Sequence, residues 1–147
     1  MKSNLAHVAI AIIHHDDSFL MQLRDDIPHI SYPGYWAFFG GHIEPGETPA
    51  VALKRELIEE IGYVAPPPVY FGDYPDVSVF RHVFHVPLVV APEQLVLGEG
   101  WDYGLLTPAA IRRGEHYSER AQQVRPLARP HQQILLDFMA SGIASQG

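Results

Sequence analysis

The chain has 147 residues with 10 basic and 17 acidic side chains, which gives a formal net charge of −7. This length suits one domain with its own core, so residues 1–147 are expected to form a single domain. An acidic chain with no visible basic face is unlike a protein that binds a nucleic-acid polymer. The absence of cysteine excludes disulfides and zinc-thiolate sites, and it favours a cytoplasmic location. No apolar stretch is long enough to span a bilayer, so no membrane association is expected.

The N-terminal part predicts two paired strands. Residues 6–13 are apolar and rich in β-branched side chains, residues 14–18 predict a turn, and residues 19–24 predict a returning strand. His14 and His15 are potential metal ligands, but neighbours on a strand point to opposite faces, which favours a plain turn.

A polar loop at residues 25–35 is long enough to border a site. It leads into a short aromatic strand at residues 36–39. Trp36 has two interpretations, a stacking surface for a planar ligand and a core side chain.

Residues 40–63 read GGHIEPGETPAVALKRELIEEIGY and carry the densest pattern of the chain. A helix is predicted with Thr48 as N-cap and Pro49 at the first helical position. It is expected to end at Gly62, which adopts the left-handed conformation easily. At about 100° per residue, one face of this helix is apolar. That face carries Ala50, Leu53, Leu57 and Ile61.

Three carboxylates, Glu56, Glu59 and Glu60, fall on a neighbouring arc of about 100°. They repel each other, and a hard divalent cation such as Mg²⁺ or Mn²⁺ reverses the sign of that interaction. The glycines before the helix allow the backbone to approach a ligand, and a helix N-terminus favours anions. Together with Arg55, this pattern favours metal-assisted phosphate chemistry over a solvated acidic helix.

The second half predicts more strands and a closing helix. A long strand at residues 77–90, bent near Pro87, carries Arg81, whose face either lines a pocket or is half exposed. The other expected elements are a strand at 69–72, a strand or extended segment at 92–97, a short helix at 107–112, a polar loop at 113–129 and a helix at 131–140 with Ile134, Leu135 and Phe138 inward.

The charged and glycine positions of residues 41–63 resemble the Nudix box, and all of them are filled. The departures are Tyr63, where the family usually has an aliphatic residue, and Phe39, where it commonly has proline. The resemblance implies an α/β fold, the Nudix α/β/α sandwich with a mixed β-sheet. It also implies a hydrolase that cleaves a diphosphate linkage in a small nucleoside diphosphate-X substrate with bound Mg²⁺ or Mn²⁺.

The resemblance implies roles for individual residues as well. Glu47 would pair with Arg55 and orient the acidic cluster. A late-loop glutamate often adds a carboxylate to the metals in this family, and Glu99, between two glycines, matches it, with Glu93 and Asp102 as rivals. The expected metal ligands are the Gly40 carbonyl, Glu56, Glu59, Glu60 and Glu99. Glu56, Glu59 and Glu99 are all candidates for the general base.

Three substrate contacts are expected. Arg24 resembles the family's phosphate-contacting arginine, Trp36 is a candidate for stacking on a nucleobase, and Arg81 is a candidate for lining the pocket. The respective alternatives are a surface arginine, a core aromatic residue and a half-exposed strand.

Other functions on this fold fit less well. A non-catalytic binding or regulatory module usually lacks box carboxylates, and none is lost here. Isomerases of the isopentenyl diphosphate type use a catalytic cysteine, which this chain does not have. Weak markers of ADP-ribose and dinucleoside polyphosphate hydrolases are missing around Ser78, Val79 and Phe80. Nucleoside triphosphates or nucleotide sugars are therefore the expected substrates, and a homodimer is left open.

Overall fold

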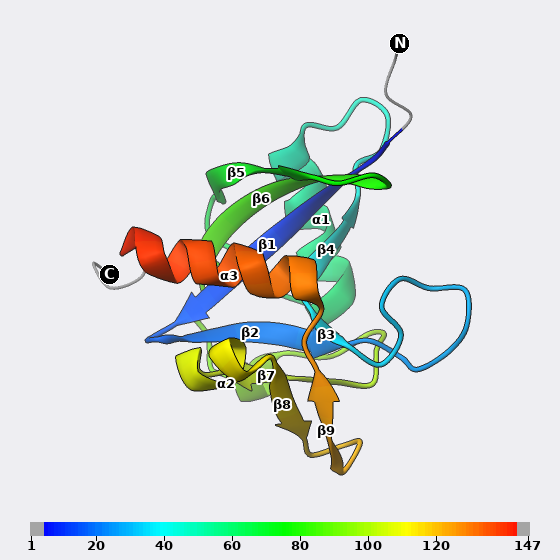
Figure 1. Cartoon of the computed structure of the whole chain (residues 1–147). Helices are drawn as coiled ribbons and strands as arrows, with labels where there is room; N and C mark the ends of the chain where they lie inside the picture. The colour runs from blue at the N-terminus through cyan, green and yellow to red at the C-terminus, as the bar shows by residue number, and fades with distance from the viewer. Residues whose placement is uncertain (1–4, 144–147) are drawn as a thin grey trace.

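The computed structural model describes residues 5–143 and shows a mixed β-sheet between helices (Figure 1). The elements are β1 (Ala6–His15), β2 (Ser18–Leu23), β3 (Trp36–Ala37), β4 (Phe39–His42), α1 (Pro49–Ile61), β5 (Val69–Pro75), β6 (Val79–Pro87), the 3₁₀ turn η1 (Pro92–Gln94), β7 (Asp102–Leu106), α2 (Pro108–Arg113), β8 (Glu115–Ser118), β9 (Gln123–Pro126) and α3 (Arg129–Ser141). Within the described part of the chain, no helix is long and apolar enough to cross a bilayer.

The main sheet is built around β1. Its central order is β3-β2-β1-β6-β5, with β4 paired to β1 and β7 paired to β2. β1 and β6 run parallel, while every other pair in this sheet is antiparallel. The expected mixed sheet is thus confirmed, and its one parallel pair requires the long crossover that contains α1.

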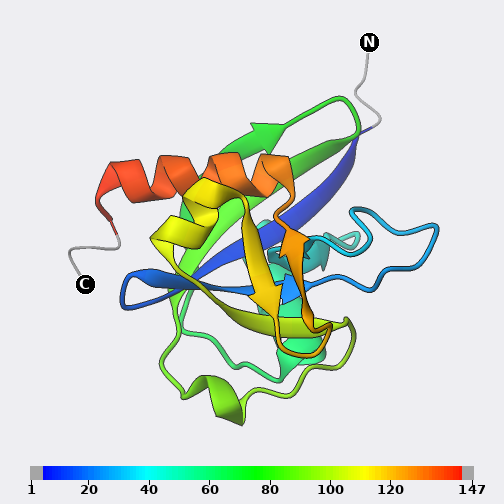
Figure 2. The ribbon, with the colours of Figure 1, turned by 60° about the horizontal axis from the view of Figure 1, so that its bottom comes forward.

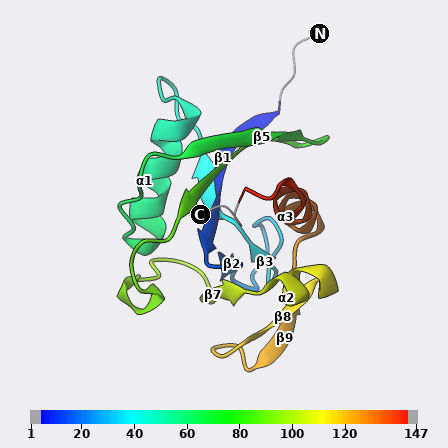
Figure 3. The same cartoon turned by 90° about the vertical axis from the view of Figure 1, so that its left-hand side faces the viewer.

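Side chains of β1 alternate between two hydrophobic cores. Ala9, Ala11 and Ile13 pack on the side of α1, whereas Ile10 and Ile12 pack on the side of α2 and α3. Figure 3 shows α1 and α3 on opposite sides of the sheet. The small alanines let α1 lie close to β1, which brings the helix that carries the acidic residues against the middle of the sheet.

Helix α1 begins and ends where the sequence predicts. The Thr48 hydroxyl accepts a hydrogen bond from the Val51 amide at 3.2 Å, Pro49 is the first helical residue, and Gly62 adopts φ 65°. Its buried residues are Ala52, Leu53, Leu57 and Ile61, and Ala50 is partly buried against the same core.

The structure adds strands in two places and decides between the alternatives at residues 92–97. Residues 102–106 form a strand because they find a partner in β2, which local sequence does not reveal. The expected loop at 113–129 contains the hairpin of β8 and β9, which stands beside β7 (Figure 2). Residues 92–97 contain the single turn η1, followed by Leu95 with an extended backbone, so the strand alternative is wrong.

Tyr63, the departure from the box pattern, has a structural use. Its ring is buried beside α1, and its hydroxyl donates to the Pro87 carbonyl at 2.7 Å and accepts from the Val89 amide at 3.0 Å. An aliphatic residue fills the same core space but makes neither bond. Tyr63 therefore joins the end of α1 to the chain that leaves β6.

Removing this hydroxyl is expected to destabilise the fold. Tyr63→Phe leaves a carbonyl and an amide without their partner, which should lower the free energy of unfolding by about 1–3 kcal/mol. The matched control is Tyr117→Phe, on an exposed tyrosine of β8, with an expected change within about 0.5 kcal/mol. Chemical denaturation measures both, and equal effects of the two substitutions would contradict the bridging role.

Candidate active site

Four carboxylates line one cavity of about 290 Å³ at the C-terminal half of α1. Its lining residues are Glu56, Glu59, Glu60, Gly98 and Glu99. The first three come from one face of the helix, and Glu99 comes from the loop between η1 and β7. The structure thus brings together the four glutamates that the sequence proposes as metal ligands.

The loop that carries Glu99 is tied to the end of α1. The Gly98 amide donates to the Glu60 carbonyl at 2.8 Å, and the Val96 amide donates to the Ile61 carbonyl at 3.2 Å. A Cβ on Gly98 would lie 3.0 Å from the Glu59 carbonyl oxygen, so glycine permits this close approach. These bonds use carbonyls that a helix end leaves free, and they hold Glu99 beside the helix carboxylates.

The two rivals of Glu99 lie elsewhere. Glu93 is exposed in η1 and does not line the acidic cavity. Asp102 is buried in β7, where it accepts hydrogen bonds from the Ser118 hydroxyl at 2.7 Å and the Tyr103 amide at 2.8 Å. Asp102 therefore joins the β8–β9 hairpin to the sheet.

Glu60 is the most perturbed acid of the cavity. Burial raises its pKa to about 8, and the charges of Glu56 and Glu99 act in the same direction. A hydrogen bond of 2.9 Å from the Gly40 amide to Glu60 Oε1 and the charge of Arg24 oppose the shift. Burial and like charge thus outweigh the local donors, so the cavity favours an added positive charge.

Arg55 is the cation that orders the acidic side chains of α1. Its Nε and Nη2 donate to both carboxylate oxygens of Glu47, at 2.7 and 2.9 Å, which confirms the expected pair. Its Nη1 donates to Glu56 at 3.0 Å and to Glu59 at 3.3 Å. The Arg55 hydrogen bond and the Glu44 amide lower the pKa of Glu47 to about 2. Arg55 therefore fixes the orientation of Glu56 and Glu59, which line the cavity.

The cavity suits a hard divalent cation in composition. Within residues 5–143, no three acidic or histidine side chains already surround one metal-sized point. The reason is that Glu56 and Glu59 turn toward Arg55 while Glu60 turns toward the Gly40 amide. The four carboxylates are nevertheless the ligand type that Mg²⁺ or Mn²⁺ prefers. The raised pKa of Glu60 shows that negative charge at this place is unfavourable, and a bound cation would compensate for it.

Gly40 and Gly41 separate the acidic cavity from a second one. A Cβ on Gly41 would lie 2.5 Å from the Glu56 carboxyl carbon, and a Cβ on Gly40 would collide with the Ala9 carbonyl oxygen. Gly40 also adopts φ 144°, which side chains rarely allow. Strand β4 can therefore pair with β1 and lie against Glu56 of α1 only because these two residues lack side chains.

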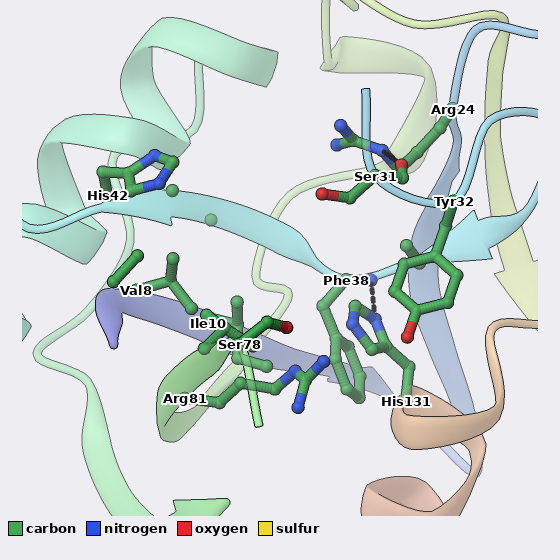
Figure 4. Close-up of a pocket in the computed structure, with 15 residues that line it drawn as sticks. Val8, Ile10, Arg24, Ser31, Tyr32, Phe38, His42, Ser78, Arg81 and His131 are labelled. Atoms are coloured by element: carbon green, nitrogen blue, oxygen red, sulfur yellow. Dashed lines mark hydrogen bonds between the residues drawn. The ribbon is translucent and has the colours of Figure 1, made fainter. Parts of the chain in front are cut away.

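The second cavity, of about 440 Å³, opens beside Gly40 and Gly41 and contains two of the expected substrate contacts, Arg24 and Arg81 (Figure 4). Arg24 donates from Nε to the Ser31 carbonyl at 2.7 Å. Arg81 is only 6% exposed, and its Nη1 donates to Asp76 at 2.8 Å. The half-exposed alternative for this part of β6 is therefore wrong for Arg81.

Trp36, the third expected contact, is corrected by the structure. It is 1% exposed in the core between the sheet and α2, and its Nε1 donates to the His116 carbonyl at 3.0 Å. It lines neither cavity. A ring enclosed in this way has no free face for a base, so the core alternative is right.

His131 is a residue of this cavity that sequence reasoning missed. Its Nδ1 accepts from the Phe38 amide at 3.0 Å, and its ring stacks on Phe38 with centroids 4.9 Å apart. Burial lowers the pKa of His131 to about 3, helped by the charges of Arg81 and Arg24. Its spacing in the sequence could have revealed it. His131 lies three residues before Ile134 and seven before Phe138, which puts it on the inward face of the same helix.

The loop at residues 25–35 borders this cavity and is braced from both sides. Arg24 bonds Ser31 inside the loop, and Arg125 Nε of β9 donates to the Gly34 carbonyl at 2.8 Å. Gly34 has φ 73°, and a Cβ there would lie 2.5 Å from Arg125 Nη2. The β8–β9 hairpin, which the sequence did not predict, thus holds the predicted loop at residues 25–35 in place.

The sequence matches the model of a known protein family. The family model for the NUDIX domain matches residues 5–125. The chain belongs to the Nudix family. This confirms the resemblance carried by residues 41–63, and the matched range includes the whole main sheet and α1.

Individual Nudix proteins are similar to different extents. The CTP pyrophosphohydrolase of Escherichia coli K12 is 36% identical over 87 residues, which cover 56% of this chain and 63% of that protein, less than two thirds of its length. The solution structure of the E. coli ORF135 protein has a TM-score of 0.68 at 26% identity and covers 95% of this chain and 92% of that one. A bifunctional NMN adenylyltransferase/ADP ribose pyrophosphatase from Francisella tularensis, complexed with AMP and a Mn ion, has a TM-score of 0.68 at 21% identity over 95% of this chain and 42% of that one. The last shows the shared fold alone.

The depressed pKa of His131 predicts an acid-sensitive fold. Its folded-state pKa of about 3 lies below the ordinary histidine pKa of 6.5, so the unfolded chain binds the proton more readily. The stabilising effect is complete above pH 6.5 and is lost as the pH falls toward 3. Between pH 7 and pH 5, it should lower the free energy of unfolding by about 2 kcal/mol.

The measurement compares this Nudix protein with His131→Gln, whose amide keeps an acceptor for the Phe38 amide but does not titrate. Denaturant unfolding at pH 7, 6 and 5 should show the wild type losing stability faster than the variant. Parallel pH curves for the two proteins would refute the prediction.

Proposed function

We propose that this chain hydrolyses a diphosphate linkage in a small nucleoside diphosphate-X substrate, a nucleoside triphosphate or a nucleotide sugar. The observation that carries the proposal is the adjacency of two cavities. One is lined by four carboxylates, and the other, on the far side of Gly40 and Gly41, contains arginines and an apolar wall. The similar E. coli protein named CTP pyrophosphohydrolase supports this choice of substrate class.

The metal would lie among Glu56, Glu59, Glu60 and Glu99, with the Gly40 carbonyl as a further oxygen ligand. When bound, Mg²⁺ or Mn²⁺ acidifies a water molecule and neutralises charge on the diphosphate. The Mn ion in the complex of the Francisella tularensis protein supports a divalent cation of this type. Glu47 and Arg55 act from behind the cluster by fixing the orientation of Glu56 and Glu59.

Arg24 is the candidate phosphate contact. It forms no ion pair with a carboxylate within residues 5–143, yet its charge influences both Glu60 and His131. It lines the second cavity and is close enough to the acidic one for its charge to act on Glu60, so the diphosphate of a bound substrate would pass near it. Cleavage of such a linkage depends mainly on positioning and on charge neutralisation, which a fixed guanidinium supplies.

A carboxylate of the acidic cavity would act as general base toward the attacking water. Glu56, Glu59 and Glu99 remain candidates, since all three face the cavity. A binding or regulatory module without catalysis is the second candidate function, and the complete set of carboxylates disfavours it.

The homodimer and the cytoplasmic location stay predictions.

Metal removal tests the proposal directly. Hydrolysis of nucleoside triphosphates and nucleotide sugars should require added Mg²⁺ or Mn²⁺ and disappear with a chelator, because four clustered carboxylates cannot hold a diphosphate without a cation. Phosphate or pyrophosphate release is the measurement. Full activity after thorough metal removal, or no turnover of any member of the panel with either ion, would sink the proposal.

A matched pair of substitutions tests the late-loop glutamate. Glu99→Gln removes a carboxylate from the cavity and should slow turnover by about 100-fold or more. Glu93→Gln makes the same change six positions earlier, outside the cavity, and should leave turnover near normal. Steady-state kinetics at saturating Mg²⁺ separates them, and similar rates for both variants would remove Glu99 from the site.

A further inference from the structure

The second cavity combines an apolar wall with a pair of buried polar side chains. Val8 and Ile10 of β1, Ala37 and Phe38 provide the apolar side, and Arg81 and His131 stand at the end nearest α3 (Figure 4). At about 440 Å³ it has room for a purine or a pyrimidine ring. An apolar wall of this kind favours a flat ring over a hydrated phosphate, which would lose water without compensation.

His131 presents a fixed donor to this cavity. Its Nδ1 is occupied by the Phe38 amide, so this nitrogen is the acceptor and the proton of the neutral ring is on Nε2. Among residues 5–143, no protein group accepts a hydrogen bond from Nε2. Stacking on Phe38 at an interplanar angle of 16° fixes the direction of the ring.

Arg81 adds further donors beside His131. Asp76 accepts from Nη1, and no other hydrogen bond of the guanidinium occurs within the described residues. Asp76 is itself held by the amides of Ser78 and Val79, at 2.9 and 3.0 Å, so the pair is rigid. Figure 4 shows the guanidinium and the imidazole reaching into the same part of the cavity.

The free polar atoms of Arg81 and His131 therefore donate and do not accept. Two adjacent donors match two adjacent acceptors on a ring edge. Cytosine presents N3 and O2, and guanine presents O6 and N7, the pair that arginine commonly binds. Adenine places an amino donor beside each candidate acceptor, and uracil places an N–H between its two carbonyls.

We propose that Arg81 and His131 determine base specificity and that the second cavity selects a base with two adjacent acceptors, cytosine or guanine, over adenine and uracil. This inference rests on the proposed function for the nature of the ligand. Binding a wrong base would leave the donors of Arg81 and His131 unpaired in a buried place, which is costly.

Binding of nucleoside monophosphates tests the inference without hydrolysis. Isothermal titration calorimetry with CMP, GMP, AMP and UMP, in the presence of Mg²⁺, should give CMP and GMP at least about tenfold tighter binding. Arg81→Met and His131→Leu should reduce this preference to within about threefold. His131→Gln, which keeps both an acceptor and a donor, should retain it.

Arg112→Met, on an exposed arginine of α2, is the matched control and should change neither affinity nor preference. Thermal unfolding of each variant checks that it is folded, and the wild-type panel alone decides the main point. Equal affinities, a preference for AMP or UMP, no binding of any monophosphate, or displacement by inorganic phosphate with no dependence on the base would overturn the inference. So would a wild-type preference that Arg81→Met and His131→Leu both leave intact.

The two proposals fail separately. Base preference without hydrolysis of any diphosphate substrate would sink the proposed function and leave the specificity assignment standing. Hydrolysis with equal kcat/KM for CTP, GTP, ATP and UTP would sink the specificity assignment alone.

Discussion

The close approach of β4 to both β1 and α1 is the constraint on which the rest of the site depends. Gly40 and Gly41 allow it because a Cβ at either position would collide with the Ala9 carbonyl or the Glu56 carboxyl group. The backbone amide of Gly40 then reaches Glu60 of the acidic cavity, and the same short segment lines the second cavity. A bulkier residue would push apart the acidic cluster and the pocket wall together, so the two halves of the site share one steric requirement.

Charge, rather than apolar packing, then organises the acidic half. Glu60 is buried close to other carboxylates, while Arg55 gathers Glu47, Glu56 and Glu59 around one guanidinium. This arrangement concentrates like charge around a buried acid, and the guanidinium fixes the orientation of the neighbouring carboxylates. The apolar face of the same helix secures its position through Leu53, Leu57 and Ile61 in the first core.

The sequence predicted those features that depend on residues close together in the chain or on the family resemblance. The cap at Thr48, the left-handed end at Gly62 and the mixed sheet were all predictable, since each depends on neighbours in the chain or on the box resemblance. Strand β7 was not, because its residues become a strand only by pairing with β2. Burial likewise decided between the alternatives for Trp36 and Arg81, whose partners His116 and Asp76 could not be known without the fold. His131 was missed because a histidine on an apolar helical face looks like core until its Nδ1 is seen to accept from Phe38.

The brace on the loop at residues 25–35 has a thermodynamic consequence. A flexible loop of this length loses conformational freedom when a ligand orders it, and that loss is subtracted from the affinity. Here Arg24 and Arg125 hold the loop from its start and from the distant β9, before any ligand is present. The entropy cost of ordering this wall of the pocket is therefore incurred during folding. A ligand that enters the cavity does not incur it again, so its binding is more favourable.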